Sequence, residues 1–203
     1  MSKLLDFKHK KVIVFDLDGT IVDLDVNWTH LKNLLSKKFS TIYSESCEFS
    51  SISRCLSEIV KRNDDDTLID FIDIVREHEL KDLENSEILR ETVFFINNPG
   101  LFGVLDGTKL AVFSLNTRKA IKEALKLANI TDQIDYIIGR EDVRKWKPNP
   151  SGLLKIQKHY NVKKEEMIYF GDLKKDLITG ENAGIDAFLI DEIIKLVKKR
   201  RRK

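Results

Sequence analysis

Two aspartates near the start of the chain are the first residues whose spacing suggests chemistry. In VIVFDLDGTIVD, Asp16 and Asp18 stand two residues apart directly after the apolar run 12–15. In an extended chain both side chains point to the same side, and two carboxylates this close repel unless a cation lies between them. Gly19 permits a sharp turn, which Thr20 can hold. The pattern indicates either a catalytic carboxylate pair or an acidic turn after a strand.

Two later motifs carry side chains that suit a phosphate group. Ser114 follows an apolar run, and a hydroxyl there would face the N–H groups of a helix that Thr117 could cap. Lys147 lies in KWKPNP, where the following proline can fix it as a point charge for a phosphoryl group. The alternatives are an ordinary serine near a helix start and a solvated lysine.

A fourth motif, FGDLKKDL, adds two more acids. Gly171 ends an apolar run, Asp172 follows it, and Asp176 lies one helical turn further on. This spacing suits a magnesium ion that takes one carboxylate directly, although such acids can equally complement a helix dipole. Because all four motifs follow expected strands, their joint occurrence favours one common site.

The elements that must position these residues alternate along most of the chain. Short apolar runs typical of buried parallel strands occupy 12–15, 109–114, 135–139, 167–172 and 187–190. Helical spacing separates them, which predicts an α/β fold with a Rossmann-like parallel sheet flanked by helices.

One long interval breaks the alternation. Residues 25–98 contain three helix-like segments and a fourth, ILRETVFFI, that could be helix or strand. We expect an inserted all-helical cap domain over 25–98, and an α/β core formed by 1–24 and 99–203. Since the insertion leaves from the carboxyl end of the first strand, it should lie at the edge where ligands bind in open sheets.

The four motifs in this order resemble those of the haloacid dehalogenase superfamily, most of whose members are magnesium-dependent phosphohydrolases. The resemblance rests on DLDGT, VFSLN, KPNP and GDLKKD and spans about residues 10–24 and 99–190. The inserted helices resemble the cap of the phosphoglycolate phosphatase and phosphomutase-like branch. A small phosphorylated metabolite is therefore the expected substrate, with phosphoglycolate as a first guess.

The resemblance implies a role for each matching residue. Asp16 corresponds to the nucleophile and Asp18 to the general acid and base, so a dehalogenase is not expected. The other matches are the phosphate-binding residues Ser114, Asn116 and Lys147, the Mg²⁺ ligands Asp16, Asp18 (through its backbone carbonyl) and Asp172, and the supporting residues Gly19, Thr20, Gly171 and Asp176.

Two positions depart from the family pattern, and the cap leaves specificity open. Leu115 separates Ser114 from Asn116, where relatives often place the asparagine next to the hydroxyl, and Leu173 replaces a common serine. Trp28 and His30 could face the pocket or could simply pack within the cap. A phosphomutase would keep the same core residues.

Composition and charge limit the other possibilities. The net charge is +2, but residues 195–203 carry seven basic groups and no acid, which leaves −5 on the rest of the chain. This basic tail is an argument for a nucleic-acid-binding protein, yet it has no interleaved aromatic residues, and nucleic acid is not an expected partner. Residues 1–194 are therefore mildly acidic as a whole.

Cysteines and hydropathy bear on location. No apolar run reaches the roughly 18 residues of a membrane helix, so no membrane association is expected. Cys47 and Cys55 form no recognised pairing pattern, which predicts free thiols and therefore a reducing, cytoplasmic location.

Overall fold

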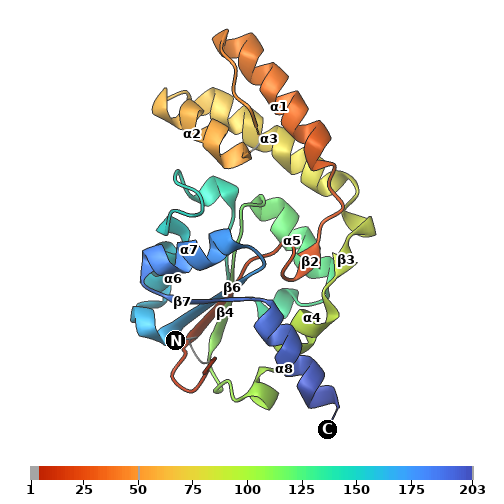
Figure 1. The fold of residues 1–203 in the computed structure, drawn as a ribbon, viewed down its shortest axis with the longest axis vertical. Coiled ribbons are helices and arrows are strands. Elements are labelled where there is room, and N and C mark those ends of the chain that lie inside the picture. The colour runs from red at the N-terminus through yellow and green to blue at the C-terminus, as the bar shows by residue number, and fades with distance from the viewer. Residues whose placement is uncertain (1–4, 50, 203) are drawn as a thin grey trace.

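Five parallel strands form the central sheet in a computed structural model that describes residues 5–49 and 51–202 (Figure 1). The strand order is β5-β4-β1-β6-β7, and all neighbouring pairs are parallel. The strands are β1 (Val12–Phe15), β4 (Lys109–Phe113), β5 (Tyr136–Ile138), β6 (Met167–Gly171) and β7 (Asp186–Leu189). They coincide, within a few residues at their ends, with the five apolar runs of the sequence, so the predicted fold class is confirmed.

Helices cover both faces of this sheet because successive strand residues point to opposite sides. Val14 and Phe113 pack on one face against α6, whereas Phe15 and Val112 pack on the other against α4, α5 and α8. The flanking helices are α4 (Arg90–Asn97), α5 (Arg118–Leu127), α6 (Ser151–Tyr160), α7 (Lys174–Ala183) and α8 (Asp191–Arg201). Single 3-10 turns connect the elements at Leu83–Asn85, Pro99–Phe102, Thr131–Gln133, Arg140–Asp142 and Lys164–Glu166.

Three further helices form a unit that projects from the sheet (Figure 1). They are α1 (Trp28–Tyr43), α2 (Ile52–Lys61) and α3 (Asp65–Lys81), and we call them the insertion. Asn27 caps α1 and Asp64 caps α3 through side-chain oxygens that accept backbone N–H groups. Phe39 and Phe71 are buried where these helices face one another. The three helical segments expected from the sequence are therefore present.

The connections between insertion and sheet contain two strands that the sequence pattern did not indicate. β2 (Val22–Asp23) pairs antiparallel with β3 (Glu87–Ile88). The ambiguous segment after β3 is the helix α4, whose Phe95 and Ile96 are buried beneath the sheet with Phe15. Because α4 packs on the sheet, we propose that the insertion ends before β3 and that α4 belongs with the core.

The prediction of free thiols was wrong. Cys47 and Cys55 form a disulfide, with a Cα–Cα distance of 6.0 Å. The segment after α1 returns beside α2, and this proximity of two chain segments cannot be read from an eight-residue spacing. The argument from free thiols to a reducing compartment therefore no longer holds. Within the described residues, no helix has the length and apolar character needed to cross a bilayer.

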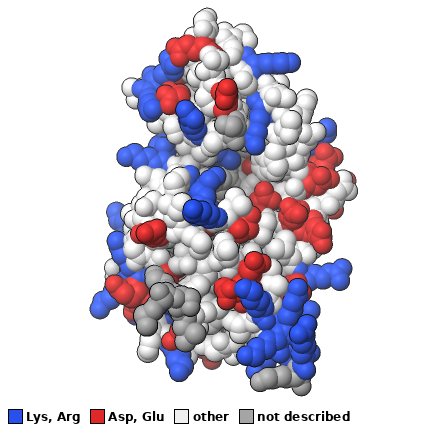
Figure 2. Space-filling view, viewed as in Figure 1, with Lys and Arg blue, Asp and Glu red and all other residues white. Residues whose placement is uncertain are grey.

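Much of the basic tail belongs to a helix. Lys198, Lys199, Arg200 and Arg201 form the last turn of α8, and Figure 2 shows basic side chains gathered at that end of the molecule. The Arg201 guanidinium lies 4.4 Å from the centre of the Phe94 ring on α4. Lys203, the last residue of the tail, lies outside the described residues.

Candidate active site

The turn after β1 brings the first two carboxylates to the carboxyl edge of the sheet. One oxygen of Asp16, Oδ1, accepts the N–H of Leu17 at 2.8 Å, and Oδ1 of Asp18 accepts the N–H of Leu24 at 2.9 Å. Gly19 has φ +69°, and a Cβ there would lie 2.5 Å from an Asp172 oxygen. A side chain at position 19 would therefore disturb both the turn and the neighbouring acid.

Thr20 contributes to this turn through its backbone and not through its hydroxyl. Its backbone N–H donates to the carbonyl of Leu17 at 3.1 Å, so the backbone closes the turn. The Thr20 hydroxyl is buried and has no hydrogen-bond partner among the described residues.

Lys147 is buried between two acids of the site. Its Nζ lies 2.8 Å from Asp16 Oδ2 and 2.9 Å from Asp176 Oδ1. The same atom lies 4.9 Å from the centre of the Phe113 ring and 5.2 Å from the centre of the Tyr169 ring. Burial alone would lower the pKa of Lys147, but the two carboxylates raise it, so the ammonium group stays charged. The alternative of a solvated lysine was therefore wrong, whereas the binding of a phosphoryl group by Lys147 stays a prediction.

Asp176 is held by three donors at the start of α7. Its carboxylate accepts from Lys147, from the Tyr169 hydroxyl at 2.7 Å and from the N–H of Leu173 at 3.1 Å. Although burial raises its pKa, Lys147 and these hydrogen bonds lower it overall. Gly171 packs directly against this side chain, so a Cβ at position 171 would collide with it.

The acids of the site offer a set of oxygen ligands for a cation. Carboxylate oxygens of Asp16, Asp172 and Asp176 all lie within 4.8 Å of one another. Burial and the charge of Asp16 raise the pKa of Asp172 to about 6, and burial is also the main reason that the pKa of Asp18 rises to about 7. Clustered hard oxygen ligands whose charges repel fit a Mg²⁺ ion, because the ion would relieve that repulsion.

Ser114 and Asn116 lie beside this cluster at the end of β4. The Ser114 hydroxyl donates to Asn116 Oδ1 at 2.7 Å, and the Asn116 amide donates to Glu79 of the insertion at 3.0 Å. Glu79 also accepts the N–H and the hydroxyl of Thr117 at 2.8 and 2.6 Å. Since Glu79 and Glu141 accept the N–H groups of Thr117 and Arg118, protein carboxylates occupy the start of α5 that was expected to face a phosphate.

One cavity of about 280 Å³ between the sheet and the insertion is lined by residues from all four motifs: Asp16, Asp18, Ser114, Asn116, Lys147, Asp172 and Asp176. Trp28 lines the cavity, in agreement with the alternative that it faces the pocket. His30 does not line it. Leu115 and Leu173, the two departures from the family pattern, line it as well. The four motifs thus converge on one small, water-accessible site.

Sequence reasoning missed two buried charged residues at this site. Glu79 lies on a helix that the sequence pattern indicated only as part of the insertion. Arg140 follows Gly139 at the end of β5, in the sequence IIGRED. The position of Arg140 at the carboxyl end of a predicted strand was a usable signal. For Glu79 the helical pattern offered none, because its partners lie almost forty residues away.

Fold and site together define the class of the protein. A model of the haloacid dehalogenase-like hydrolase family matches residues 13–190, so the chain belongs to this family. The enzyme class expected from the sequence is confirmed: the chain is a hydrolase of the phosphatase type.

Individual relatives extend over most of the chain. The pyrophosphatase PpaX of Halalkalibacterium halodurans is 29% identical over 191 residues, which cover 90% of this chain and 84% of the relative. PpaX of Bacillus mycoides is 25% identical, covering 90% and 84%.

Solved structures show the same fold at lower identity. A haloacid dehalogenase-like hydrolase from Bacteroides fragilis superposes with a TM-score of 0.61 and 22% identity, covering 88% of this chain and 86% of that one. A protein described as a predicted phosphoglycolate phosphatase from Haemophilus somnus gives a TM-score of 0.58 and 16% identity, covering 90% and 85%.

Proposed function

We propose that this chain is a magnesium-dependent phosphatase that hydrolyses small phosphate monoesters through an aspartyl-phosphate intermediate. The observation that carries the proposal is the buried contact of Asp16 with Lys147, in a cavity that Asp18, Ser114 and Asp172 also line. A carboxylate fixed beside a cation and a hydroxyl can attack phosphorus while the neighbouring groups bind the phosphoryl oxygens.

In the first step an Asp16 oxygen forms a bond to phosphorus, and the bond from phosphorus to the leaving oxygen breaks. Asp18 gives its proton to that leaving oxygen. Its Oδ1 accepts the N–H of Leu24, so Oδ2 is the atom that can carry the proton. Because burial raises the pKa of Asp18 to about 7, this side chain can hold a proton near neutral pH.

In the second step water replaces Asp16 on phosphorus. Asp18, now ionised, takes a proton from the water while the water oxygen attacks, and the bond between Asp16 and phosphorus breaks to release phosphate. Lys147 and the hydroxyl of Ser114 stabilise the phosphoryl oxygens in both steps. One acid–base residue therefore serves both halves of the reaction.

Asp16, Asp172 and the backbone carbonyl of Asp18 are the groups that would hold Mg²⁺. When bound, the ion neutralises charge on the phosphoryl group and on the nucleophile, so that two anions can approach each other. Asp176 is committed to Lys147, Tyr169 and Leu173, which favours a supporting role for it.

The size of the cavity and the curated relatives guide the choice of substrate. A volume of about 280 Å³ suits a small phosphorylated metabolite better than a polymer. The PpaX relatives are named for a hydrolytic activity, which supports hydrolysis over the phosphomutase alternative and adds inorganic pyrophosphate to the substrates to test.

Substitution of the nucleophile tests the proposal. With Mg²⁺ and an aryl phosphate, Asp16→Asn should lose at least about a thousandfold in kcat, because the amide cannot form the intermediate. Asp132→Asn is the matched control, since Asp132 is an exposed acid of the 3-10 turn Thr131–Gln133 outside the cavity, and it should retain activity. Retained hydrolysis by Asp16→Asn would refute the assignment, and isomerisation that depends on a bisphosphate would favour a mutase.

A further inference from the structure

Arg140 is a buried cation at the site for which the reaction above has no use. It follows β5 and is only 3% exposed, yet it lines the cavity with Ser114 and Lys147. Its backbone is fixed on both sides, because its N–H donates to the Asn116 carbonyl at 2.8 Å and its carbonyl accepts from Trp146 Nε1 at 2.9 Å. The backbone from which the guanidinium projects is therefore held beside the cavity.

The hydrogen-bonding capacity of this guanidinium is almost unused. Its only side-chain hydrogen bond among the described residues runs from Nη1 to Ser53 Oγ at 3.5 Å, and its buried Nε has no partner there. A guanidinium has five N–H donors, and buried donors without acceptors are costly. The cavity therefore contains a cation whose donors lack acceptors.

Glu79 balances the charge of Arg140 without occupying these donors. Burial lowers the pKa of Arg140 and the charge of Glu79 opposes this effect, but the two side chains form no ion pair within 4 Å among the described residues. Both oxygens of Glu79 already accept from Asn116 and Thr117. Arg140 thus keeps its charge and its free donors.

The N-terminal end of α2, in the insertion, lies at the same cavity as Arg140. Ser51, Ile52 and Ser53 form the N-terminal end of the ten-residue helix α2 and line the same cavity. No side chain caps this helix among the described residues. The unpaired N–H groups of a helix start attract anions, so two independent anion-attracting groups meet across the cavity.

We propose that Arg140, Ser53 and the first turn of α2 bind a second anionic group of the substrate, carried on its leaving group. The inference rests on the proposed function, since it assumes that the first anionic group is the phosphoryl group at Asp16. It narrows the substrate class to phosphorylated carboxylates and diphosphates.

The spacing of the strands places Arg140 and Asp16 close enough for one small molecule to contact both. Phe113 pairs with Ile138, so Ser114 and Gly139 end neighbouring strands, and β1 with Asp16 lies one strand further. Two strand spacings place the Arg140 and Asp16 backbones roughly 10 Å apart, and both side chains line the cavity between them. Lys147 is not available for the second group, because in the proposed reaction it binds the phosphoryl group at Asp16, its ion-pair partner.

Binding to a protein that cannot turn over gives the most direct test. Asp16→Asn with Mg²⁺ would be titrated calorimetrically with 2-phosphoglycolate, inorganic pyrophosphate and ethyl phosphate, of which the last lacks a second anionic group. The first two probes should bind about ten- to a hundredfold more tightly than ethyl phosphate, as expected for a charge-assisted contact.

Addition of Arg140→Met should abolish this preference and leave the affinity for ethyl phosphate within about threefold. Arg144→Met is the matched control, because this arginine lies in the same loop, pairs with Asp65 and is 55% exposed. It should leave all three affinities unchanged. If the methionine variant does not fold, Arg140→Lys replaces it: this variant keeps a charge but loses the planar set of donors, so it should reduce the preference for the doubly charged probes without changing the affinity for ethyl phosphate.

Two outcomes would overturn the proposal: equal weakening of all three probes by the Arg140 substitutions, or no preference for doubly charged probes before substitution. Failure of the proposed function has a different signature. In that case the protein with Asp16 intact would hydrolyse none of the probes, while the Arg140-dependent binding preference would persist.

Discussion

Lys147 determines the charge balance of the site at the scale of single residues. It contacts Asp16 and Asp176 directly, whereas Asp172 has no ion-pair partner among the described residues. Lys147 is therefore the cation in direct contact with the acidic cluster and is outnumbered by its carboxylates, and the excess negative charge within the cluster destabilises the folded protein. A bound divalent cation would remove that penalty, which makes metal binding measurable as stability.

Magnesium should raise the melting temperature of the protein, and Asp172→Asn should abolish most of this increase. At a Mg²⁺ concentration about a hundred times Kd, the expected stabilisation is about 2.7 kcal/mol. Without metal the variant should melt above the wild-type protein, because it buries one carboxylate fewer next to Asp16. Calorimetry in chelator and in increasing Mg²⁺ measures both effects.

The matched control is Asp106→Asn, which removes an exposed acid outside the cavity. It should show the full wild-type response to Mg²⁺. If Asp172→Asn responded to Mg²⁺ as strongly as this control does, Asp172 would not be a metal ligand.

At the scale of elements, Glu79 joins the insertion to the sheet. It projects from α3, is 1% exposed and accepts hydrogen bonds from Asn116 and Thr117 at the start of α5. Asn116 in turn accepts from Ser114, so the position of a phosphate-binding hydroxyl depends on a helix of the insertion. Glu79 is thus a positioning residue.

Glu79→Ala should cost about 3–5 kcal/mol of unfolding free energy, because it leaves Arg140 without its counter-charge and three donors without their acceptor. Glu79→Gln should cost less, about 1–3 kcal/mol, since one amide N–H would face a donor. Denaturant unfolding measures these values. KM should rise more than kcat falls, and the glutamine variant should recover part of the loss.

Glu77→Gln is the control for this series, because Glu77 lies on the exposed side of the same helix. Its stability and kinetics should equal those of the wild-type protein. A Glu79→Ala variant with wild-type stability and KM would show that the link between α3 and α5 has no role in positioning Ser114.

The predictability of these elements follows from how local their signals are. The strands around Val14 and Phe113 are buried on both faces and appear as continuous apolar runs, and the motif residues at their ends were assigned to one site for that reason. β2 and β3 are two residues long each and carry no such pattern.

The missed contacts join segments that are far apart in the chain or meet only through the course of a loop. The hydrogen bond from Asn116 to Glu79 joins residues 37 apart, and the disulfide between Cys47 and Cys55 depends on how the chain returns from α1 to α2. Local periodicity carries no information about such contacts, so they became visible only in the folded chain.

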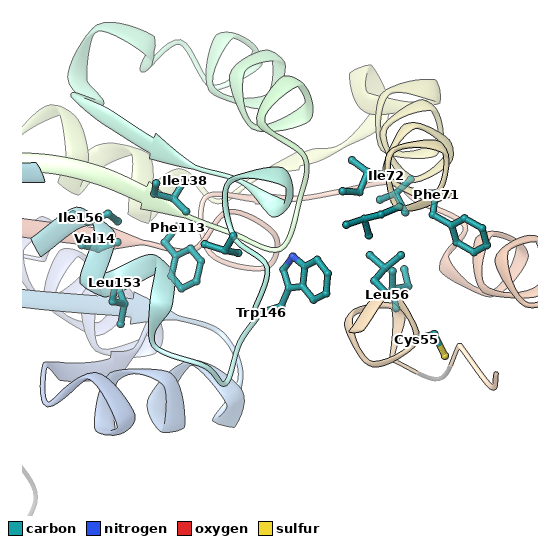
Figure 3. Packing of buried hydrophobic residues seen from close by; sticks show 14 of the residues in the cluster. Val14, Cys55, Leu56, Phe71, Ile72, Phe113, Ile138, Trp146, Leu153 and Ile156 are labelled. Atoms are coloured by element: carbon teal, nitrogen blue, oxygen red, sulfur yellow. The ribbon is translucent and has the colours of Figure 1, made fainter. Parts of the chain in front are cut away.

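At the scale of the whole molecule, a single apolar cluster connects the sheet with the insertion. Figure 3 shows Trp146 between Phe113 and Leu153 of the core and Leu56 and Ile72 of the insertion. Trp146 is 5% exposed and donates its indole N–H to Arg140. Because this side chain fills the space between the two units, we expect them to unfold together.

Trp146→Ala should therefore uncouple the two units. Truncation of a buried tryptophan costs about 3–5 kcal/mol, and the insertion should then unfold before the sheet. The chain has two tryptophans, so in this variant Trp28 on α1 alone reports the insertion by fluorescence, while circular dichroism reports the whole molecule. The two transitions should coincide in the wild-type protein and in Trp146→Phe, which keeps an aromatic side chain between the units. Coincident transitions in Trp146→Ala would show that contacts other than Trp146, such as those of Glu79, suffice to hold the molecule together as one cooperative unit.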